Sequence, residues 1–264
     1  MGGTPSWRVG IDVGGTFTDL CLVDATGRRI ILAKVLTTPR DLARGVISGL
    51  ERALAAGGVP ASMVTHIIHG TTVATNAIIE RKGARTALIT TRGFRDVLEI
   101  GREFRYDTDD PYIVFPEPLV PRWLRREVTE RVTASGEVLA EPDSGEIAAL
   151  ARELLDVGVE SVAIAFLHAY ADHRHERAAA VRFAEIAPAV SVSTSAEVAR
   201  QEREFERTST CVLNAYVKPL VNRYLGRLES GLSNVGAGGR LMIKMSSGGM
   251  ADVSTERAVA VRLV

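Results

Sequence analysis

Apolar and polar positions alternate in three short runs near the start of the chain. These runs are Arg8 to Val13, Thr18 to Val23 and Ile30 to Leu36, and the turn Asp24-Ala-Thr-Gly27 separates the second from the third. A period of two is typical of β-strands that bury one face, and short turns favour antiparallel neighbours. The pattern therefore predicts an antiparallel meander up to Leu36.

The period then lengthens to that of a helix. Pro39 and Asp41 open this segment and Gly57-Gly58 closes it, as expected for a capped helix that ends at glycine. Its apolar positions share one face and are Leu42, Val46, Leu50 and Leu54. A strand over residues 64–69 and a helix over 72–81 are predicted to follow.

Strands and helices alternate in the middle of the chain. The expected elements are a strand over 86–90, a short helix or turn over 93–101, a strand over 127–133, a helix over 143–157, a strand over 161–166, a helix over 173–186 and a strand over 190–193. Prolines between residues 106 and 122 predict a loop there. Alternating helices and strands favour a parallel sheet, so a second α/β unit is predicted.

A long helical pattern covers residues 199–232, with Pro219 as a candidate break. It begins with a charge run, Glu202 to Arg207, that is typical of a salt-bridged, solvent-exposed face. A strand over 241–245 then leads to the turn Ser246-Ser-Gly-Gly249. The predicted segments of the chain are therefore 1–80, 81–195 and 196–264.

Composition and charge exclude several classes of protein. The 264 residues are 46% hydrophobic, and 32 Lys and Arg balance 32 Asp and Glu, so nothing attracts the chain generally to nucleic acid or to an anionic membrane. It has no apolar run of about 18 residues and no signal-peptide pattern, so we expect a cytoplasmic protein. Cys21 and Cys211 are predicted to be buried thiols in a reducing compartment.

The most informative segment is Asp12-Val-Gly-Gly-Thr-Phe-Thr-Asp19, which follows the first apolar run. Gly14 and Gly15 can adopt positive φ and bring backbone N–H groups against a phosphate. Thr16 and Thr18 can add hydroxyl donors. Asp12 can hold the water shell of Mg²⁺, which prefers oxygen ligands. The segment is therefore interpreted as a nucleotide-phosphate loop.

A simpler interpretation of this segment is a hairpin turn, since paired glycines between apolar runs are typical of hairpins. A structural hairpin needs neither carboxylate, although a hairpin can also carry a phosphate at its tip. In the phosphate-loop interpretation, Asp19 can hold water around the metal in the same way as Asp12, or it can orient a threonine. The loop lacks the Lys-Ser/Thr ending of a Walker loop and the third glycine of a Rossmann loop. Its strand, glycine turn and strand instead resemble the first phosphate loop of the actin, Hsp70 and sugar-kinase ATPases, which implies ATP.

A second polar cluster, His69-Gly-Thr-Thr-Val-Ala-Thr-Asn76, lies where a strand ends and a helix opens. Thr71 and Thr72 can contact a terminal phosphate or an oxyanion there, and Asn76 is one turn further along. Threonine is also a favoured helix cap, so capping and packing are the alternative. His66 and His69 fall on opposite faces of the predicted strand, which argues against a shared metal.

Four blocks in order carry a family resemblance. They are Val9-Gly-Ile-Asp-Val-Gly-Gly-Thr-Phe-Thr-Asp19, His69-Gly-Thr-Thr-Val-Ala-Thr-Asn76, Thr91-Arg-Gly-Phe-Arg-Asp-Val-Leu-Glu-Ile-Gly101 and Glu206-Arg-Thr-Ser-Thr-Cys-Val-Leu-Asn-Ala-Tyr-Val217. Together they resemble the hydantoinase A and 5-oxoprolinase family, which also includes subunits of acetone and acetophenone carboxylases. The resemblance implies an α/β, actin-like (ribonuclease H-like) ATPase N-terminal lobe. Residues 1–80 would hold its phosphate hairpin, 81–195 an inserted α/β domain, and 196–264 the helix and strand that return to the core.

The resemblance also implies an ATP-dependent hydrolase or carboxylase subunit that uses ATP and Mg²⁺. Such a protein phosphorylates the carbonyl or enolate oxygen of a lactam, hydantoin or ketone, and a hydantoinase B-type subunit or domain completes ring opening or carboxylation. The catalytic residues implied are Asp12, Thr72 and Asn76. Asp12 would also hold Mg²⁺ through water. Ser247-Gly248-Gly249 resembles an Asn-Gly-Gly turn of the family. The nucleotide contacts implied are Gly14, Gly15, Thr16, Thr18, Thr71, Gly248 and Gly249.

Two departures from the family pattern matter. Cys211 stands where threonine is usual, and the chain stops at Val264, before the family's second glycine-rich phosphate loop and remaining lobe. That lobe is expected in cis or in trans, and this chain alone is expected to be inactive, because phosphoryl transfer needs charge stabilisation from all sides. A non-catalytic assembly subunit and a small-molecule kinase that releases a stable phosphate product stay open as alternatives.

Overall fold

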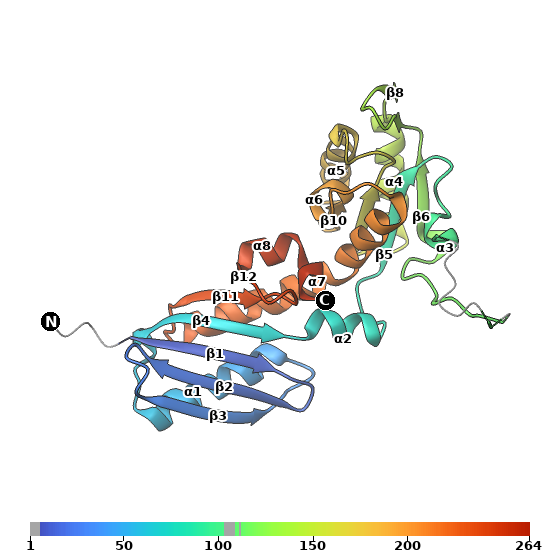
Figure 1. The fold of residues 1–264 in the computed structure, drawn as a ribbon. Helices are drawn as coiled ribbons and strands as arrows, with labels where there is room; N and C mark the ends of the chain where they lie inside the picture. Colours follow the sequence, from blue (N-terminus) through green and yellow to red (C-terminus); the bar gives the residue numbers. More distant parts are fainter. Residues whose placement is uncertain (1–5, 103–108, 111) are drawn as a thin grey trace. The chain divides into compact units, whose positions relative to one another are not determined.

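The computed structural model describes residues 6–102, 109–110 and 112–264. The chain forms two compact units, one that runs up to Lys82 and resumes with Leu220–Val264, and one made of Gly83–Pro219. Figure 1 follows both units in sequence colours, from blue at the N-terminus to red at the C-terminus. The second unit is thus inserted in the sequence of the first.

The predicted segments differ from these units mainly at the return to the first unit. The boundary predicted after residue 80 lies close to Lys82. The return predicted after residue 195 instead falls inside helix α7 (Glu204–Asn234), between Pro219 and Leu220. Packing explains the difference, because the first half of α7 buries Cys211, Val212 and Ala215 in the core of the second unit.

A six-stranded sheet forms the centre of the first unit, in the order β12-β11-β4-β1-β2-β3 (Figure 1). Its strands are β1 (Trp7–Val13), β2 (Phe17–Asp24), β3 (Ile30–Leu36), β4 (Val64–Thr71), β11 (Arg240–Lys244) and β12 (Met250–Asp252). The meander of β1, β2 and β3 is antiparallel, as predicted, whereas β1, β4 and β11 are parallel neighbours. Three adjacent strands therefore end at the same edge of the sheet.

The first unit contains several helices, the first of which begins and ends at recognisable signals. They are α1 (Leu42–Gly57), α2 (Val73–Ile79), α8 (Val253–Ala258) and the second part of α7, with 3₁₀ turns at Ala61–Met63 and Ala260–Leu263. Asp41 caps α1 by accepting a hydrogen bond from the Arg44 N–H, and Gly58 ends the helix in the left-handed conformation. Both ends of this helix agree with the prediction.

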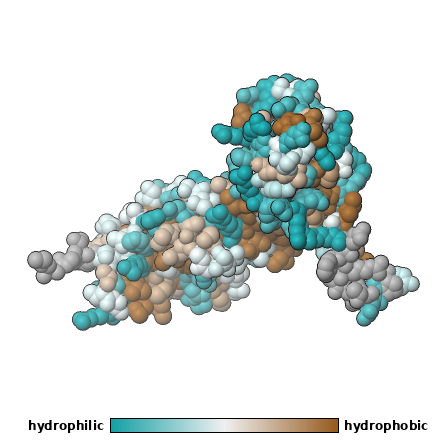
Figure 2. All heavy atoms as spheres, turned by 45° about the horizontal axis from the view of Figure 1, so that its top comes forward, coloured by the Kyte–Doolittle hydropathy of each residue, from teal (hydrophilic) through white to brown (hydrophobic). Residues whose placement is uncertain are grey.

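One face of this sheet is packed and the other carries exposed side chains. Alternate residues of β1 are buried, namely Val9, Ile11 and Val13. Helix α1 packs so closely that a Cβ on Gly49 would lie 2.7 Å from Leu20. Leu32 points to the opposite face and is 76% exposed. Figure 2 likewise shows apolar side chains at the surface, as brown patches among teal and white.

The second unit is built on a parallel sheet in the order β10-β9-β5-β6. Its strands are β5 (Thr86–Thr91), β6 (Arg125–Val128), β9 (Ser161–Ala165) and β10 (Ser191–Thr194), and a separate hairpin pairs β7 (Arg131–Val132) with β8 (Val138–Ala140). Its helices are α3 (Val97–Ile100), α4 (Ser144–Asp156), α5 (Arg174–Ile186), α6 (Ser195–Val198), the first part of α7 and a 3₁₀ turn at Arg122–Leu124. The predicted parallel α/β unit is confirmed.

Several predicted elements differ in detail from those observed. The strand predicted over 127–133 is broken into β6 and β7, because the buried Glu130 turns the chain between them. The helix predicted over 199–232 begins later, at Glu204, and runs unbroken past Pro219, where Val217 and Val221 are both buried. Of the predicted loop over 106–122, residues 106–108 and 111 lie outside the described residues.

Across the described ranges, every helix is too short or too polar to cross a bilayer.

Candidate functional site

Three polar segments of the first unit follow the carboxyl ends of neighbouring parallel strands. The Gly14-Gly15 turn follows β1, Thr71 to Asn76 ends β4 and opens α2, and the turn over residues 246–249 follows β11. Val13 pairs with Thr71, so the first two segments start level with one another. Carboxyl ends of parallel strands are the usual ligand-binding edge of such sheets. Segments predicted separately from the sequence therefore meet at one edge.

The Gly14-Gly15 turn is tight, and its backbone is open on one side. The Gly14 N–H donates to the Phe17 carbonyl at 3.0 Å, and the Thr37 hydroxyl donates to the Gly14 carbonyl at 2.9 Å. A Cβ on Gly15 would meet nothing within 4 Å. Within the described chain, the N–H groups of Gly15 and Thr16 have no hydrogen-bond partner. The turn therefore presents free donors to an approaching anion.

Two expectations for this turn are wrong. Neither Gly14 nor Gly15 has φ in the left-handed region. Close approach accounts for Gly14, where a Cβ would lie 3.1 Å from the Phe17 carbonyl oxygen. Thr18 does not point toward a ligand either. It is 1% exposed, and its hydroxyl lies 3.1 Å from that of Thr37. Thr18 thus supports the turn from the packed face, while Thr16 is exposed at the tip.

Asp12 lies on the open face of the sheet, beside the turn. It is exposed, and its carboxylate makes no hydrogen bond or ion pair to any residue that the structure describes. A Cβ on Gly70 would lie 3.2 Å from Asp12 Oδ1, so glycine leaves this carboxylate room. Asp19 is instead paired with Lys34 at 2.7 Å. Only Asp12 therefore remains free to hold the water shell of a cation.

The donor set at Asp12 fits Mg²⁺ better than a metal held mainly by protein. No cluster of three His, Cys, Asp or Glu side chains in the described residues is arranged to ligate a metal ion. Mg²⁺ usually keeps several waters and is held by one or two carboxylates together with phosphate oxygens. A single free carboxylate next to open backbone N–H groups matches that preference.

The second segment packs against the first through Thr72. Its hydroxyl lies 3.5 Å from the Val13 carbonyl and accepts a hydrogen bond from Asn76 Nδ2 at 3.3 Å. Thr72 occupies the cap position of α2, yet its side chain makes no capping hydrogen bond. Thr71 Oγ1 instead accepts from the Val73 N–H at 3.3 Å. The Thr71 hydroxyl therefore supports the start of α2, whereas the Thr72 hydroxyl links the second segment to the end of β1 and to Asn76.

A depression of about 600 Å³ brings Gly14, Gly15, Thr72 and Asn76 together. Four cationic side chains also line it, and the sequence reading missed them: Arg40, Lys82, Arg223 and Arg227. Arg40 and Arg223 form no ion pair with any described residue, whereas Lys82 pairs with Glu80 at 2.7 Å. Such cations favour phosphate and carboxylate groups. In the sequence, the i, i+4 spacing of Arg223 and Arg227 within one predicted helix was the feature that could have indicated these cations.

The turn after β11 lies at the same sheet edge but outside this depression. Gly248 has φ +90°, which only glycine adopts readily, and the Met245 N–H donates to the Gly249 carbonyl at 2.8 Å. A Cβ on Gly249 would lie 2.6 Å from the terminal methyl of the flexible Met245 side chain, which can move aside. Gly248 therefore has a structural reason to be present, and contact of either glycine with nucleotide stays a prediction.

His69 is buried beneath the second segment. Its Nε2 lies 2.6 Å from the Tyr224 hydroxyl, and its Nδ1 has no partner. Burial lowers the pKa of His69 to about 4 and raises that of Tyr224, which a hydrogen bond with Thr71 opposes. His66 and His69 lie on opposite faces of β4, as predicted. The neutral pair thus ties the end of β4 to α7.

Tyr224→Phe is expected to lower the free energy of unfolding of the first unit by about 1–3 kcal/mol, because it leaves His69 Nε2 buried without a partner. Urea titration of the variant measures this, with the exposed Tyr112→Phe as control. Since the pKa of His69 is lowered on folding, its contribution to stability is present above pH 6.5 and is lost as the pH falls toward 4. If Tyr224→Phe were as stable as Tyr112→Phe, the hydrogen bond between Tyr224 and His69 would not contribute to stability, which would contradict the prediction.

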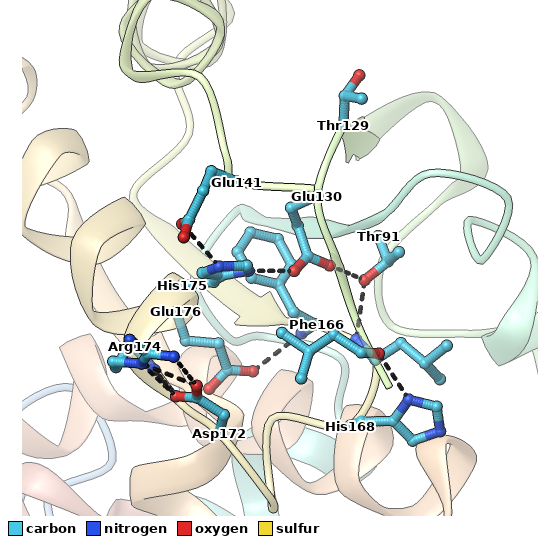
Figure 3. Close-up of polar contacts among 12 residues, drawn as sticks. Thr91, Thr129, Glu130, Glu141, Phe166, His168, Asp172, Arg174, His175 and Glu176 are labelled. Atoms are coloured by element: carbon cyan, nitrogen blue, oxygen red, sulfur yellow. Dashed lines mark hydrogen bonds and ion pairs between the residues drawn. The ribbon is translucent and has the colours of Figure 1, made fainter. Parts of the chain in front are cut away.

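A separate, buried polar cluster lies in the second unit, at the carboxyl ends of its strands (Figure 3). Glu130 accepts a hydrogen bond from the Thr91 hydroxyl and lies 2.8 Å from His175 Nδ1. The other ring nitrogen, His175 Nε2, lies 2.9 Å from Glu141, but the geometry is not that of a hydrogen bond. Thr91, Glu130 and His175 are each no more than 3% exposed. A buried cluster of this kind, whose members bond mainly to one another, holds loops in place rather than receiving a ligand.

Glu176 is the centre of a neighbouring buried network. Its carboxylate accepts hydrogen bonds from the Phe166 and Ala196 N–H groups, each at 2.9 Å, and from the Ser195 hydroxyl. Arg207 Nε donates to the same Ser195 oxygen at 3.2 Å. Burial raises the pKa of Glu176 to about 7, while these hydrogen bonds and Arg207 oppose the rise. Arg207 is 1% exposed, so its predicted place on a solvated face is wrong.

The chain is similar to known proteins over most of its length. Residues 8–187 match the hydantoinase/oxoprolinase N-terminal region, and residues 207–264 match hydantoinase/oxoprolinase. Caprolactamase subunit alpha of Pseudomonas jessenii is 37% identical over 96% of this chain and 37% of its own length. The acetophenone carboxylase gamma subunit of Aromatoleum aromaticum is 32% identical over 93% of this chain and 36% of its own length.

A solved structure extends the likeness to three dimensions. The nucleotide-free structure of acetone carboxylase, from work on ATP-dependent acetone carboxylation, has a TM-score of 0.85 at 26% identity. The match covers 98% of this chain and 39% of that one. The chain therefore spans little more than a third of the length of these relatives, which include a lactam hydrolase and carboxylases. With two family models matching in order, the chain belongs to the hydantoinase/oxoprolinase family and has its actin-like ATPase fold.

Proposed function

We propose that this protein uses Mg-ATP to phosphorylate the carbonyl or enolate oxygen of a small lactam, hydantoin or ketone. A hydantoinase B-type subunit or domain then completes ring opening or carboxylation. The observation that carries the proposal is the meeting of the β1 turn and the β4 segment, with free N–H donors at Gly15 and Thr16 and arginines in the depression beside them. A free carboxylate, Asp12, lines a separate depression on the open face of the sheet, next to the same turn in the sequence. The relatives named above support the substrate class.

Each residue has a distinct task in this proposal. The N–H groups of Gly15 and Thr16 bind phosphate oxygens, and Asp12 orients the waters of Mg²⁺. The bound ion would neutralise charge on the phosphates. Thr72 and Asn76 lie in the same depression as the glycine turn, where their side chains hold the transferred phosphoryl group or the substrate. The remaining stabilisation is expected from sequence or subunits beyond these residues.

The chemistry balances without any further reactant for lactam hydrolysis. The carbonyl oxygen attacks the terminal phosphorus and ADP leaves. Water then adds to the activated carbon, and the bond from that carbon to the ring nitrogen breaks as the nitrogen takes a proton, which leaves an acyl phosphate. A second water attacks the acyl carbon, and the bond from that carbon to the phosphorylated oxygen breaks. The original carbonyl oxygen therefore departs with inorganic phosphate, and the ring opens to an amino acid.

Labelled substrate tests this route directly. A lactam or a hydantoin that stimulates ATP hydrolysis is prepared with ¹⁸O in its carbonyl group and turned over by the protein together with its native partner sequences. Mass spectrometry should find the label in inorganic phosphate. Label confined to the organic product would contradict phosphorylation of the carbonyl, and accumulation of a phosphorylated product would indicate a kinase instead.

Thr72→Ala is expected to lower substrate-stimulated ATP hydrolysis about 10- to 100-fold, because the proposed contact of its hydroxyl with the transferred group would act mainly in the transition state. Affinity for Mg-ATP should change much less. Steady-state kinetics and calorimetry separate the two effects, and Thr72→Ser should restore most of the rate. Unchanged stimulation in Thr72→Ala would remove this residue from the site.

A further inference from the structure

One row of residues crosses the open face of the first unit's sheet. In the order of the strands β3, β2, β1, β4 and β11 it consists of Lys34, Asp19, Asp12, Gly70 and Lys244. The first four are register partners across the sheet. Ile243 pairs with His69, so the next position places Lys244 beside Gly70. All five residues line one depression of about 660 Å³.

Charges in this row are only partly compensated. Lys34 Nζ lies 2.7 Å from Asp19 and closes one end of the row. Asp12 and Lys244 are both exposed, and neither side chain has an ion-pair or hydrogen-bond partner among the residues that the structure describes. The row therefore keeps one unpaired carboxylate and one unpaired ammonium group.

Gly70 separates these two free charges. It contributes no side chain, and a Cβ there would approach Asp12 Oδ1 to 3.2 Å. Neighbouring strands lie about 4.8 Å apart, so the backbones carrying Asp12 and Lys244 are roughly 10 Å apart across Gly70. The two side chains therefore flank a bare strip of backbone, next to the carboxyl ends of β1 and β4.

A metal-bound phosphate has the charge pattern that suits this strip. Its hydrated cation seeks a carboxylate, and its phosphate oxygens seek a cation. The lysine side chain is long and flexible and carries a compact charge, so the ammonium group of Lys244 can reach over Gly70. Lys34 cannot play the same part, because it is held by Asp19 and stacks 4.8 Å from the Phe17 ring.

We propose that Lys244 is a phosphate-binding residue, which holds an oxygen of the Mg-bound nucleotide from the side of Gly70 opposite to Asp12. This inference rests on the proposed use of Mg-ATP and adds a contact outside the glycine turns. Lys244 precedes the Ser246 to Gly249 turn and lies outside the four sequence blocks that carried the family resemblance. Only the register of β11 against β4 brings it to Asp12.

Calorimetric titration of Mg-ATP tests the assignment on the protein with any further sequence and subunits that it naturally carries. Lys244→Gln should weaken Mg-ATP binding about tenfold, as expected for loss of a charge-assisted hydrogen bond. Lys244→Arg should stay close to the wild type, because it keeps the charge. The control Lys34→Gln removes an ammonium group from the opposite end of the same row and should change affinity less than about twofold.

The magnesium dependence separates the two sides of the strip. At fixed ATP, Asp12→Asn should raise the Mg²⁺ concentration needed for half-maximal binding, whereas Lys244→Gln should lower affinity at saturating Mg²⁺. Equal binding by wild type and Lys244→Gln would overturn the assignment while leaving the proposed function intact. An equal loss in Lys34→Gln would also overturn it, by showing a general charge effect. Absence of Mg-ATP binding by the wild type would overturn both proposals.

Discussion

Asp12→Asn is expected to slow substrate-stimulated ATP hydrolysis about 10²–10³-fold, while affinity for Mg-ATP falls only a few-fold. The asparagine keeps the shape of the side chain but loses the charge that orients the waters around Mg²⁺. The free carboxylate has no other described partner whose loss could disturb the fold. Steady-state rates over a range of Mg²⁺ concentrations, together with calorimetric affinities, measure the two quantities.

Asp19→Asn is the matched control for this variant. Asp19 pairs with Asp12 across the strands, but its charge is already compensated by Lys34 at 2.7 Å. Exposed pairs of this kind contribute about 0–1 kcal/mol, so the control should retain nearly the full rate. If Asp12→Asn kept the wild-type rate, or if both variants lost activity equally, Asp12 would not be the metal-orienting group.

Arg207→Met is expected to lower the free energy of unfolding of the second unit by about 3–5 kcal/mol, as is typical when one partner of a buried charged pair is removed. Arg207 donates to Ser195, Gln201 and Phe166 from a buried position. Its loss leaves the Glu176 carboxylate without a nearby cation. Denaturant unfolding, followed by a signal from this unit, measures the change.

Measurements at two pH values distinguish loss of charge pairing from loss of packing. Folding raises the pKa of Glu176 to about 7, so its contribution to stability is present below pH 4.5 and is lost as the pH rises through 7. Removing Arg207 strengthens that trend, and Arg207→Met should therefore cost more at pH 8 than at pH 5. The double variant Arg207→Met with Glu176→Gln should recover part of the loss at pH 8. An equal loss at both pH values would point to packing alone.

Local patterns were sufficient for most of the fold. The strand Ile30–Leu36 agrees residue for residue with the alternating run, and α1 begins after Asp41 and ends before Gly58, because capping groups and glycine act within a few residues. Predictions failed where distant groups decide. Glu130 interrupts a strand because its partners, Thr91 and His175, come from other parts of the chain.

Residues of the candidate site also fall into two groups, those that local sequence patterns predict and those that depend on contacts distant in the sequence. Sequence alone identified the β1 turn and the β4 segment, since glycines, threonines and carboxylates cluster within each. It could not show that Thr18 points inward, because that depends on which face of β2 is packed. It also missed Arg40 and Arg223, which line one depression through the loop after β3 and the packing of α7. Lys244 was missed as well, because only the sheet register brings it to Asp12.

Hydrogen–deuterium exchange with and without Mg-ATP tests most directly whether this edge of the sheet binds nucleotide. The protein is compared in both states, together with any partner subunits that it naturally has. Protection is predicted in peptides covering residues 13–17, 70–77 and 244–249, with little change in strands β5 and β9. Protection confined to the second unit, or no protection at the β1 turn, would contradict the account.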